Sequence, residues 1–155
     1  MACVRLEAES YADDATAAFI NENFVPIEAH IKEHPAYFHR FDVLWTPTVL
    51  ILDSNGKERE RNEGYLSNLE FRARLEMGLA RIAFMHKQWP AAERRYAEVA
   101  EKYPRTSAAP EAIYWRGASR YKATNDHSAL SEAADELAKK YPANLWTLKA
   151  SVWSH

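Results

Sequence analysis

The sequence has little cysteine and little glycine, and these shortages exclude several kinds of site. Cys3 is the single cysteine among 155 residues, so the chain cannot close a disulfide within itself. Four isolated glycines cannot form the glycine-rich loop that cradles a phosphate group. No serine stands in the G-x-S-x-G pattern that marks a nucleophile of α/β-hydrolases. We therefore expect no cofactor and no serine-type active site.

An excess of charge of one sign is absent as well, and so are long apolar runs. The 20 basic and 22 acidic residues give a net charge of -2, which offers no reason to expect nucleic acid or an anionic membrane as partner. No apolar run approaches the length of a membrane span, and the first residues lack the apolar segment of a signal peptide. Together with the single cysteine, this composition leads us to expect a cytoplasmic protein.

The most informative stretch runs from Trp45 to Tyr65. Val49–Leu52 is an apolar run rich in β-formers, which predicts a buried strand. Asn55-Gly56 is the dipeptide that supplies positive φ in a two-residue hairpin turn. The charged residues after it suit a second strand at a sheet edge, and we expect Glu58–Arg61 to form a solvated face.

The order W-T-P-T, apolar strand, hairpin, charged strand and Gly64-Tyr65 resembles the second half of a thioredoxin-like domain. The resemblance covers roughly the first half of the chain. In that family the proline after the threonine is cis, and the backbone before it receives an extended substrate peptide. The resemblance therefore implies a cis bond at Thr46-Pro47 and a peptide-binding site at Trp45, Thr46 and Pro47.

The residues before this stretch predict two helices, a strand and a short helix. The first helix covers Cys3–Glu9, and Asp13 or Asp14 caps a second one that continues to about Glu22. Phe24–Ile31 follows as a strand, in which Pro26 favours an edge position. A short helix begins at His34-Pro35.

The position of Cys3 leaves two explanations open. Thioredoxin-like enzymes carry C-x-x-C at a helix start, where the first thiol attacks a disulfide and the second resolves the intermediate. Cys3-Val4-Arg5-Leu6 resembles that helix from the second cysteine onward, so Cys3 is a candidate resolving thiol. The first cysteine, and the central strand before it, would precede Met1. The chain is then either a shortened form of a longer protein or a variant without redox chemistry, and it cannot run a two-cysteine cycle by itself.

A missing central strand has a structural consequence. The strands at Phe24–Ile31 and Thr48–Asp53 would flank an unfilled position in the sheet, and unpaired strand edges beside a core are costly. We expect either direct pairing of these two strands or a strand supplied by another polypeptide, including a second copy of the chain as a homodimer.

The second half of the chain carries a helical pattern that repeats. Ser67–Glu70 reads as a capping box that opens a long helix to about Lys87. Tyr103-Pro104 and Tyr141-Pro142 stand 38 residues apart, and apolar positions before and after them match at the same offset. This periodicity predicts an internal repeat of helix pairs, closed by a solitary helix over Asn144–Trp153.

The first of these units resembles a tetratricopeptide repeat. Leu79-Ala80 fits the large-small pair of its first helix, and Ala92, Tyr96 and Pro104 fit the second helix. The second unit departs from the pattern, because Leu130 and Ala134 replace the usual alanine and aromatic residue.

We therefore predict two parts that share one helix. Residues 1–66 form an α/β thioredoxin-like module with an incomplete sheet. Residues 67–155 form an all-α array of helix pairs, and the long helix 68–87 belongs to both. Tyr114, Trp115 and Tyr121 are either core residues between helices or the wall of a groove that accepts a partner helix or peptide.

No metal site is predicted. His30, His34 and His39 lie close in sequence, but no cysteine pair or H-E-x-x-H motif accompanies them. The function that we favour is a non-catalytic adaptor or chaperone-like protein that binds a protein or peptide. The alternatives are a truncated thiol-disulfide oxidoreductase and an oligomer-forming scaffold.

Overall fold

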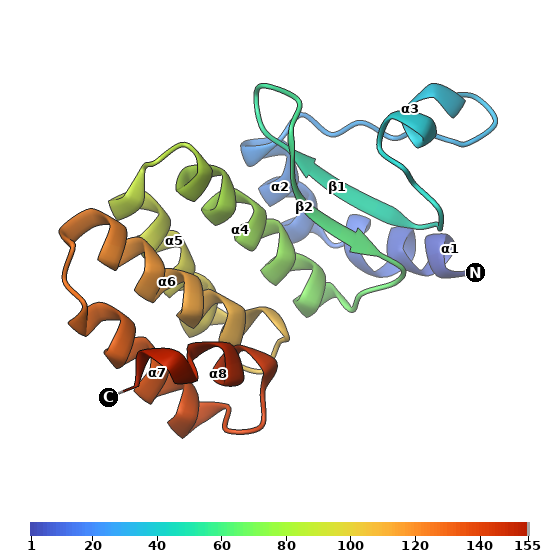
Figure 1. Ribbon diagram of the computed structural model, residues 1–155. Helices are drawn as coiled ribbons and strands as arrows, with labels where there is room; N and C mark the ends of the chain where they lie inside the picture. The colour runs from blue at the N-terminus through green and yellow to red at the C-terminus, as the bar shows by residue number, and fades with distance from the viewer. Residues whose placement is uncertain (155) are drawn as a thin grey trace.

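The computed structural model describes residues 1–154, in which a mixed first half precedes a helical second half (Figure 1). The first half contains α1 (Ala2–Leu6), a π-helical segment η1 (Glu7–Tyr11), α2 (Asp14–Asn23), α3 (Pro35–Arg40), β1 (Thr48–Leu52) and β2 (Glu58–Glu63). The second half contains α4 (Asn68–Met85), α5 (Trp89–Lys102), α6 (Ala108–Thr124), α7 (Ser128–Lys140), α8 (Leu145–Ala150) and a 3₁₀ turn η2 (Ser151–Trp153). A two-stranded sheet with helices followed by a helical segment confirms the predicted fold class.

Side-chain caps begin the helices where the sequence predicts them. The Asp13 carboxylate accepts a hydrogen bond of 2.8 Å from the Thr16 amide, and α2 starts at Asp14. The Ser67 hydroxyl accepts from the Glu70 amide at 3.4 Å, but the reciprocal half of the capping box is not formed. The Glu70 carboxylate instead accepts from the amide and hydroxyl of Ser107, at 2.8 and 2.9 Å. Glu70 therefore connects the start of α4 to the start of α6.

The β-hairpin is present, but its turn is longer than predicted. β1 and β2 pair antiparallel, with Leu50 opposite Arg61 and a register shift after Ile51. Of the turn residues, Gly56 has positive φ (71°) whereas Asn55 does not. The Asp53 carboxylate accepts from the amides of Asn55 and Lys57, at 2.9 and 3.1 Å. These bonds stabilise a five-residue loop in place of the two-residue turn.

The prediction that Glu58–Arg61 forms a solvated face is wrong for part of the strand. Side chains of a strand alternate between its two faces, but the register shift at Arg59 brings Glu58 to the face of Arg61, where the two pair at 2.6 Å on the outer side. The Glu60 side chain points toward α4 instead and is only 10% exposed. The strand therefore places the charged carboxylate of Glu60 in the interior, where it needs oppositely charged or hydrogen-bonding neighbours.

The predicted strand over Phe24–Ile31 is not formed. Residues 24–30 have no regular structure, and the side chains of Val25 and Ile27 are exposed. Within residues 1–154, no backbone hydrogen bond joins this segment to β1, so the expected direct pairing is wrong. Pro26 has no amide to donate, and an extended segment becomes a strand only beside another strand.

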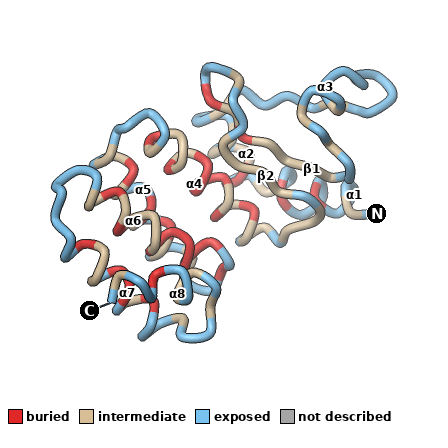
Figure 2. Tube along the Cα trace, in the orientation of Figure 1, coloured by how far each residue is buried: buried red, intermediate tan, exposed pale blue. Residues whose placement is uncertain are grey.

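Helix α4 packs against both halves of the chain (Figure 2). Phe71 and Leu75 lie in one buried cluster with Leu6 and Ile51 of the first half. The other side of α4 contributes to a second cluster with α5 and α6, whose α4 members are Ala73, Met77, Ala80 and Ala83. α4 thus supplies the interface between the hairpin and the helices.

Helices α5 and α7 end in the same way. The Tyr103 amide donates to the Val99 carbonyl at 3.0 Å, and the Tyr141 amide donates to the Leu137 carbonyl at 2.8 Å. The two tyrosines of the 38-residue spacing thus both lie at the C-terminal end of a helix, while the repeat itself stays a prediction. The final helix is shorter than predicted, because α8 ends at Ala150 and a 3₁₀ turn follows. The predicted array ends at His155, which lies outside the described residues. No helix in residues 1–154 combines the length and apolar character needed to span a bilayer.

Candidate functional site

The segment around Pro47 is a fixed bend at the end of the hairpin. The Thr46-Pro47 bond is cis, as the resemblance implies. The Pro47 carbonyl accepts a hydrogen bond of 2.7 Å from the Gly64 amide, next to the end of β2. The Thr48 hydroxyl donates to the Trp45 carbonyl, also at 2.7 Å. The bend is therefore connected to β2 on one side and stabilised internally on the other.

Large apolar side chains are exposed at this bend. Trp45 is 70% exposed and Leu44 is 88% exposed. Leu44 lines an open hollow of about 230 Å³, and Trp45 is the next residue in the sequence. The hollow is lined by Ile31, Pro35, Phe38, His39, Asp42, Val43 and Leu44. We call Leu44, Trp45 and this hollow the Trp45 surface. A contiguous exposed apolar patch on a folded protein commonly marks a binding site.

Cys3 lies on α1, at the same end of the hairpin as Pro47 (Figure 1). The Arg5 guanidinium stacks 4.5 Å from the centre of the Tyr65 ring, and the Tyr65 hydroxyl donates to the Glu9 carboxylate. Tyr65 directly follows Gly64, which binds Pro47. The Cys3 thiol is free and exposed. The structure thus connects the helix of the candidate thiol to the candidate peptide site through Tyr65.

Aromatic side chains gather where α4, α6 and the C-terminal helix meet. Tyr114 stacks on Trp153 with ring centres 4.2 Å apart and also contacts Trp146 at 5.1 Å. Trp115 meets Phe84 of α4 edge to face, at 5.1 Å. We call these five residues the aromatic face.

Tyr121 does not join the aromatic face. Its ring contacts His127 at 4.9 Å, near the other end of α6. Of the three groove residues proposed from the sequence, the structure therefore brings Tyr114 and Trp115 together and leaves Tyr121 apart.

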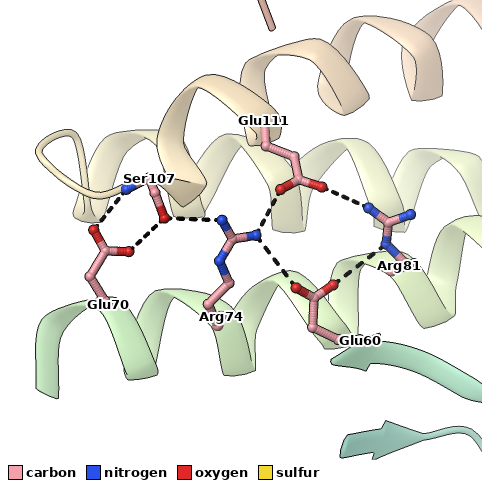
Figure 3. Close-up of polar contacts among 6 residues, drawn as sticks. All are labelled: Glu60, Glu70, Arg74, Arg81, Ser107 and Glu111. Atoms are coloured by element: carbon pink, nitrogen blue, oxygen red, sulfur yellow. Dashed lines mark hydrogen bonds and ion pairs between the residues drawn. The ribbon is translucent and has the colours of Figure 1, made fainter. Parts of the chain in front are cut away.

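A largely buried group of charged side chains lies between β2, α4 and α6, and no sequence pattern predicted it (Figure 3). Arg74 lies 2.7 Å from Glu111 and 3.4 Å from Glu60. Arg81 lies 2.8 Å from Glu111 and 3.7 Å from Glu60. We call these four residues the charge cluster. The spacing of the two arginines places them on one face of α4, but the glutamates come from elements distant in sequence.

Burial governs how the groups in this region ionise. Burial and the neighbouring Glu111 raise the pKa of the Glu60 carboxyl, although Arg74 and Arg81 oppose this. Burial and a hydrogen bond to Glu76 raise the pKa of Tyr103 to about 12. Burial acts in the same direction on Asp53, yet hydrogen bonds from Arg59, the Lys57 amide and His86 hold the pKa of its carboxyl below the usual range. Two buried carboxyl groups of one hairpin thus shift in opposite directions.

The three histidines do not assemble a site in the described part of the chain. The Lys32 amide donates to the His30 ring at 3.3 Å, and His34 packs edge to face on Tyr37. Among residues 1–154, no group of three or more His, Cys, Asp or Glu side chains is arranged to hold a metal ion.

A comparison with protein families matches residues 1–78 to the thioredoxin-like domain. The chain belongs to the thioredoxin-like family. The match covers half of the chain and includes Cys3, the Trp45 surface and Pro47. It ends inside α4, beyond residue 66, so the predicted domain boundary remains a prediction. Comparisons with curated proteins and with solved structures find no match. The thioredoxin-like assignment thus applies to the Pro47 site and not to the aromatic face.

Proposed function

We propose that this thioredoxin-like protein is a non-catalytic adaptor or chaperone-like protein that binds an extended segment of a partner at Trp45, Thr46 and Pro47. The observation that carries the proposal is the exposure of Trp45 beside the cis bond to Pro47. Buried tryptophans supply much of the energy of protein interfaces. A partner that covers Trp45 would therefore gain more binding free energy here than at an average surface position.

The backbone of the bend supports the same function. The Pro47 and Trp45 carbonyls already accept hydrogen bonds from Gly64 and Thr48. In the described chain, the Thr46 backbone has no hydrogen-bond partner, and the residue is exposed. An extended peptide binds by pairing its main chain with such groups, while pockets accept alternate side chains. The hollow beside Leu44 is a pocket of that kind.

A binding assay with a matched control tests this proposal. Peptides selected from a random library on the immobilised full chain are measured by fluorescence anisotropy. Trp45→Ala should weaken binding by about tenfold or more, since the loss of a central anchor costs at least about 1.4 kcal/mol. Leu145→Ala removes another exposed apolar side chain, at the opposite end of the molecule, and should leave the affinity unchanged. Equal affinity of the Trp45→Ala variant and the wild type would contradict the proposal.

The aromatic face is the second binding surface of this proposal. Its residues come from α4, α6 and the C-terminal helix, the first members of successive helix pairs, which in tetratricopeptide-like arrays line a concave groove. Of the groove residues predicted from the sequence, Tyr114 and Trp115 belong to this surface and Tyr121 does not, and a helix or extended peptide is the fitting partner. Trp146→Ala should then weaken partner binding, whereas Leu148→Ala, on the exposed side of α8, should not.

The open edge of β1 suits a strand from another polypeptide. Hydrogen-bonded pairs alternate along an antiparallel ladder, and the bond between Gly64 and Pro47 sets their phase. The backbone groups of Thr48, Leu50 and Leu52 then point away from β2. We propose that a partner or a second copy pairs there. Light scattering tests this through the mass of the protein in solution.

An exposed free thiol fits a reducing compartment, and on that ground we propose that the protein is cytoplasmic.

One observation favours a second candidate function, that of a thiol-disulfide oxidoreductase. Cys3 is exposed in the first turn of α1, at the Pro47 end of the hairpin, where a resolving thiol would act. The chain alone should show no turnover in an insulin-reduction assay, because it has one thiol. An extended version with a cysteine three positions before Cys3 should restore turnover. Failure of that version to reduce insulin would exclude this candidate.

A further inference from the structure

The two glutamates of the charge cluster are held unequally (Figure 3). Both arginines approach Glu111 within 2.8 Å, at hydrogen-bond distance. Their distances to Glu60 are 3.4 and 3.7 Å, which are long for hydrogen bonds. Both arginines would therefore stay hydrogen-bonded to Glu111 if Glu60 lost its charge. The connection of β2 to α4 is the weaker part of the cluster.

Arg81 joins this cluster to the aromatic face. Its guanidinium lies 5.1 Å from the centre of the Trp115 ring, while its nitrogens face Glu60 and Glu111. A cation over an indole is attracted to the ring face, and the attraction depends on where the charge lies. Any shift of Arg81 toward Glu111 therefore changes the environment of Trp115.

Glu60 is surrounded by charged and titratable groups from three helices. Arg74 and Arg81 face it from α4, and Glu111 faces it from α6. Tyr96 of α5 lies within the same electrostatic environment, and burial raises the pKa of its hydroxyl, so it stays neutral. Since burial and Glu111 also raise the pKa of Glu60, its carboxylate accepts a proton before exposed glutamates do as the pH falls.

The other end of the hairpin is held by contacts of a different kind. The Asp53 carboxylate lies 3.2 Å from the His86 ring at the end of α4, and it also pairs with Arg59 at 2.7 Å. Hydrogen bonds lower the pKa of the Asp53 carboxyl, so Asp53 keeps its negative charge and this contact at a pH at which Glu60 accepts a proton. Acid therefore weakens the hairpin's contact at Glu60 while it keeps the contact at the turn.

We propose that Glu60 is a proton-sensitive link between the hairpin and the aromatic face. When the Glu60 carboxylate accepts a proton, Arg74 and Arg81 remain with Glu111, and β2 separates from α4 by pivoting at Asp53. Arg81 then moves relative to Trp115. The environment of Trp115 on α6 therefore changes when the thioredoxin-like hairpin moves. This switch requires no ligand and is independent of what the protein binds.

Nuclear magnetic resonance of the indole N–H groups tests the switch on the full chain. The Trp115 signal is assigned with Trp115→Phe and followed from about pH 7.5 to about pH 4. It should show one titration step with a midpoint above about 4.3, the ordinary value for a glutamate. Glu60→Gln should abolish the step. Glu63→Gln removes an exposed charge from the same strand and should leave the step in place.

Four results would overturn the proposal, and three of them concern the Trp115 signal. The first is a flat Trp115 signal in the wild type, and the second is a step that survives in Glu60→Gln. The third is a step that also disappears in Glu63→Gln, which would show that the step does not depend on Glu60 specifically. Amide exchange of residues 58–63 provides a reading that needs no variant. Their protection factors, which correct for the slower intrinsic exchange in acid, should fall over the same pH range as the Trp115 step, and unchanged protection factors would equally contradict the pivot.

Discussion

The two halves of this protein bury their side chains to very different extents. Between residues 21 and 50 no residue is buried, whereas α5, α6 and α7 each contain fully buried side chains (Figure 2). Helix pairs pack against their neighbours in sequence, so an array completes its core locally. A sheet needs strands that are distant in sequence, and here β1 has one neighbour among the described residues. The difference teaches that the helical half completes its core with its own helices, while the thioredoxin-like half leaves apolar side chains and one edge of β1 uncovered.

The largest effect should come from the core of the array. Leu137 is fully buried in α7, and Leu137→Ala should reduce the free energy of unfolding by about 2–5 kcal/mol. Ile27 is 75% exposed, and Ile27→Ala should change it by no more than about 0.5 kcal/mol. Urea denaturation measures both values. Equal losses would show that the 24–31 segment contributes to the core, and the comparison between the halves would fail.

An intermediate effect is expected where the halves meet. A Cβ at Gly78 would overlap the Cδ1 atom of Ile51, so β1 approaches α4 closely. Gly78→Ala should destabilise the fold by about 1–3 kcal/mol through overpacking, although alanine favours a helix.

Ile51→Val shortens the opposing side chain and provides the control for this prediction. The double variant should recover part of the loss, because neighbouring sites are not additive. A stabilising Gly78→Ala substitution would mean that the hairpin does not press against α4.

A smaller effect should come from the cap of α2. Asp13 accepts hydrogen bonds from the amide and the hydroxyl of Thr16. Asp13→Ala should cost about 1 kcal/mol, the usual value for losing an N-cap. Asp13→Asn keeps an acceptor and should cost less. If the two variants melt at the same temperature, the cap does not stabilise the first half.

The smallest effect is the change in stability with pH that Asp53 causes, which should be absent near neutral pH and appear only in acid. Because its pKa is lowered in the folded state, its contribution to stability is complete above about pH 4, the unfolded value. That contribution is lost as the pH falls further, since the unfolded chain then binds the proton more tightly. Urea midpoints should be level from about pH 7 to about pH 5 and then fall. Asp53→Asn should flatten the fall, and an unchanged slope would contradict this assignment.

Local signals predicted much of the fold. The Asp13 cap, the hairpin and the long helix from Asn68 depend on residues close in sequence, and the structure contains all three. The five-residue turn was not predicted, because it depends on hydrogen bonds from two amides of the loop to the Asp53 carboxylate. The strand over Phe24–Ile31 failed for another reason, since strand formation depends on a neighbour that periodicity does not reveal.

The candidate site was predicted less completely. Trp45 and Pro47 were found through a resemblance, and the cis bond agrees with it. The charge cluster was missed because Glu60 and Glu111 are 51 residues apart, and no local pattern connects them. Tyr121 shares a helix with Tyr114 but faces His127, because the C-terminal helix reaches Tyr114 only.

Hydrogen exchange with a selected peptide tests the central claim most directly, namely that the thioredoxin-like half is an unfilled binding surface. In the free chain, amides of residues 24–47 outside α3 should exchange rapidly and those of α5 to α7 slowly. With saturating peptide, protection should appear around Thr46 and along β1 while the array stays unchanged. Slow exchange of residues 24–30 in the free chain, or peptide protection confined to the array, would contradict the account.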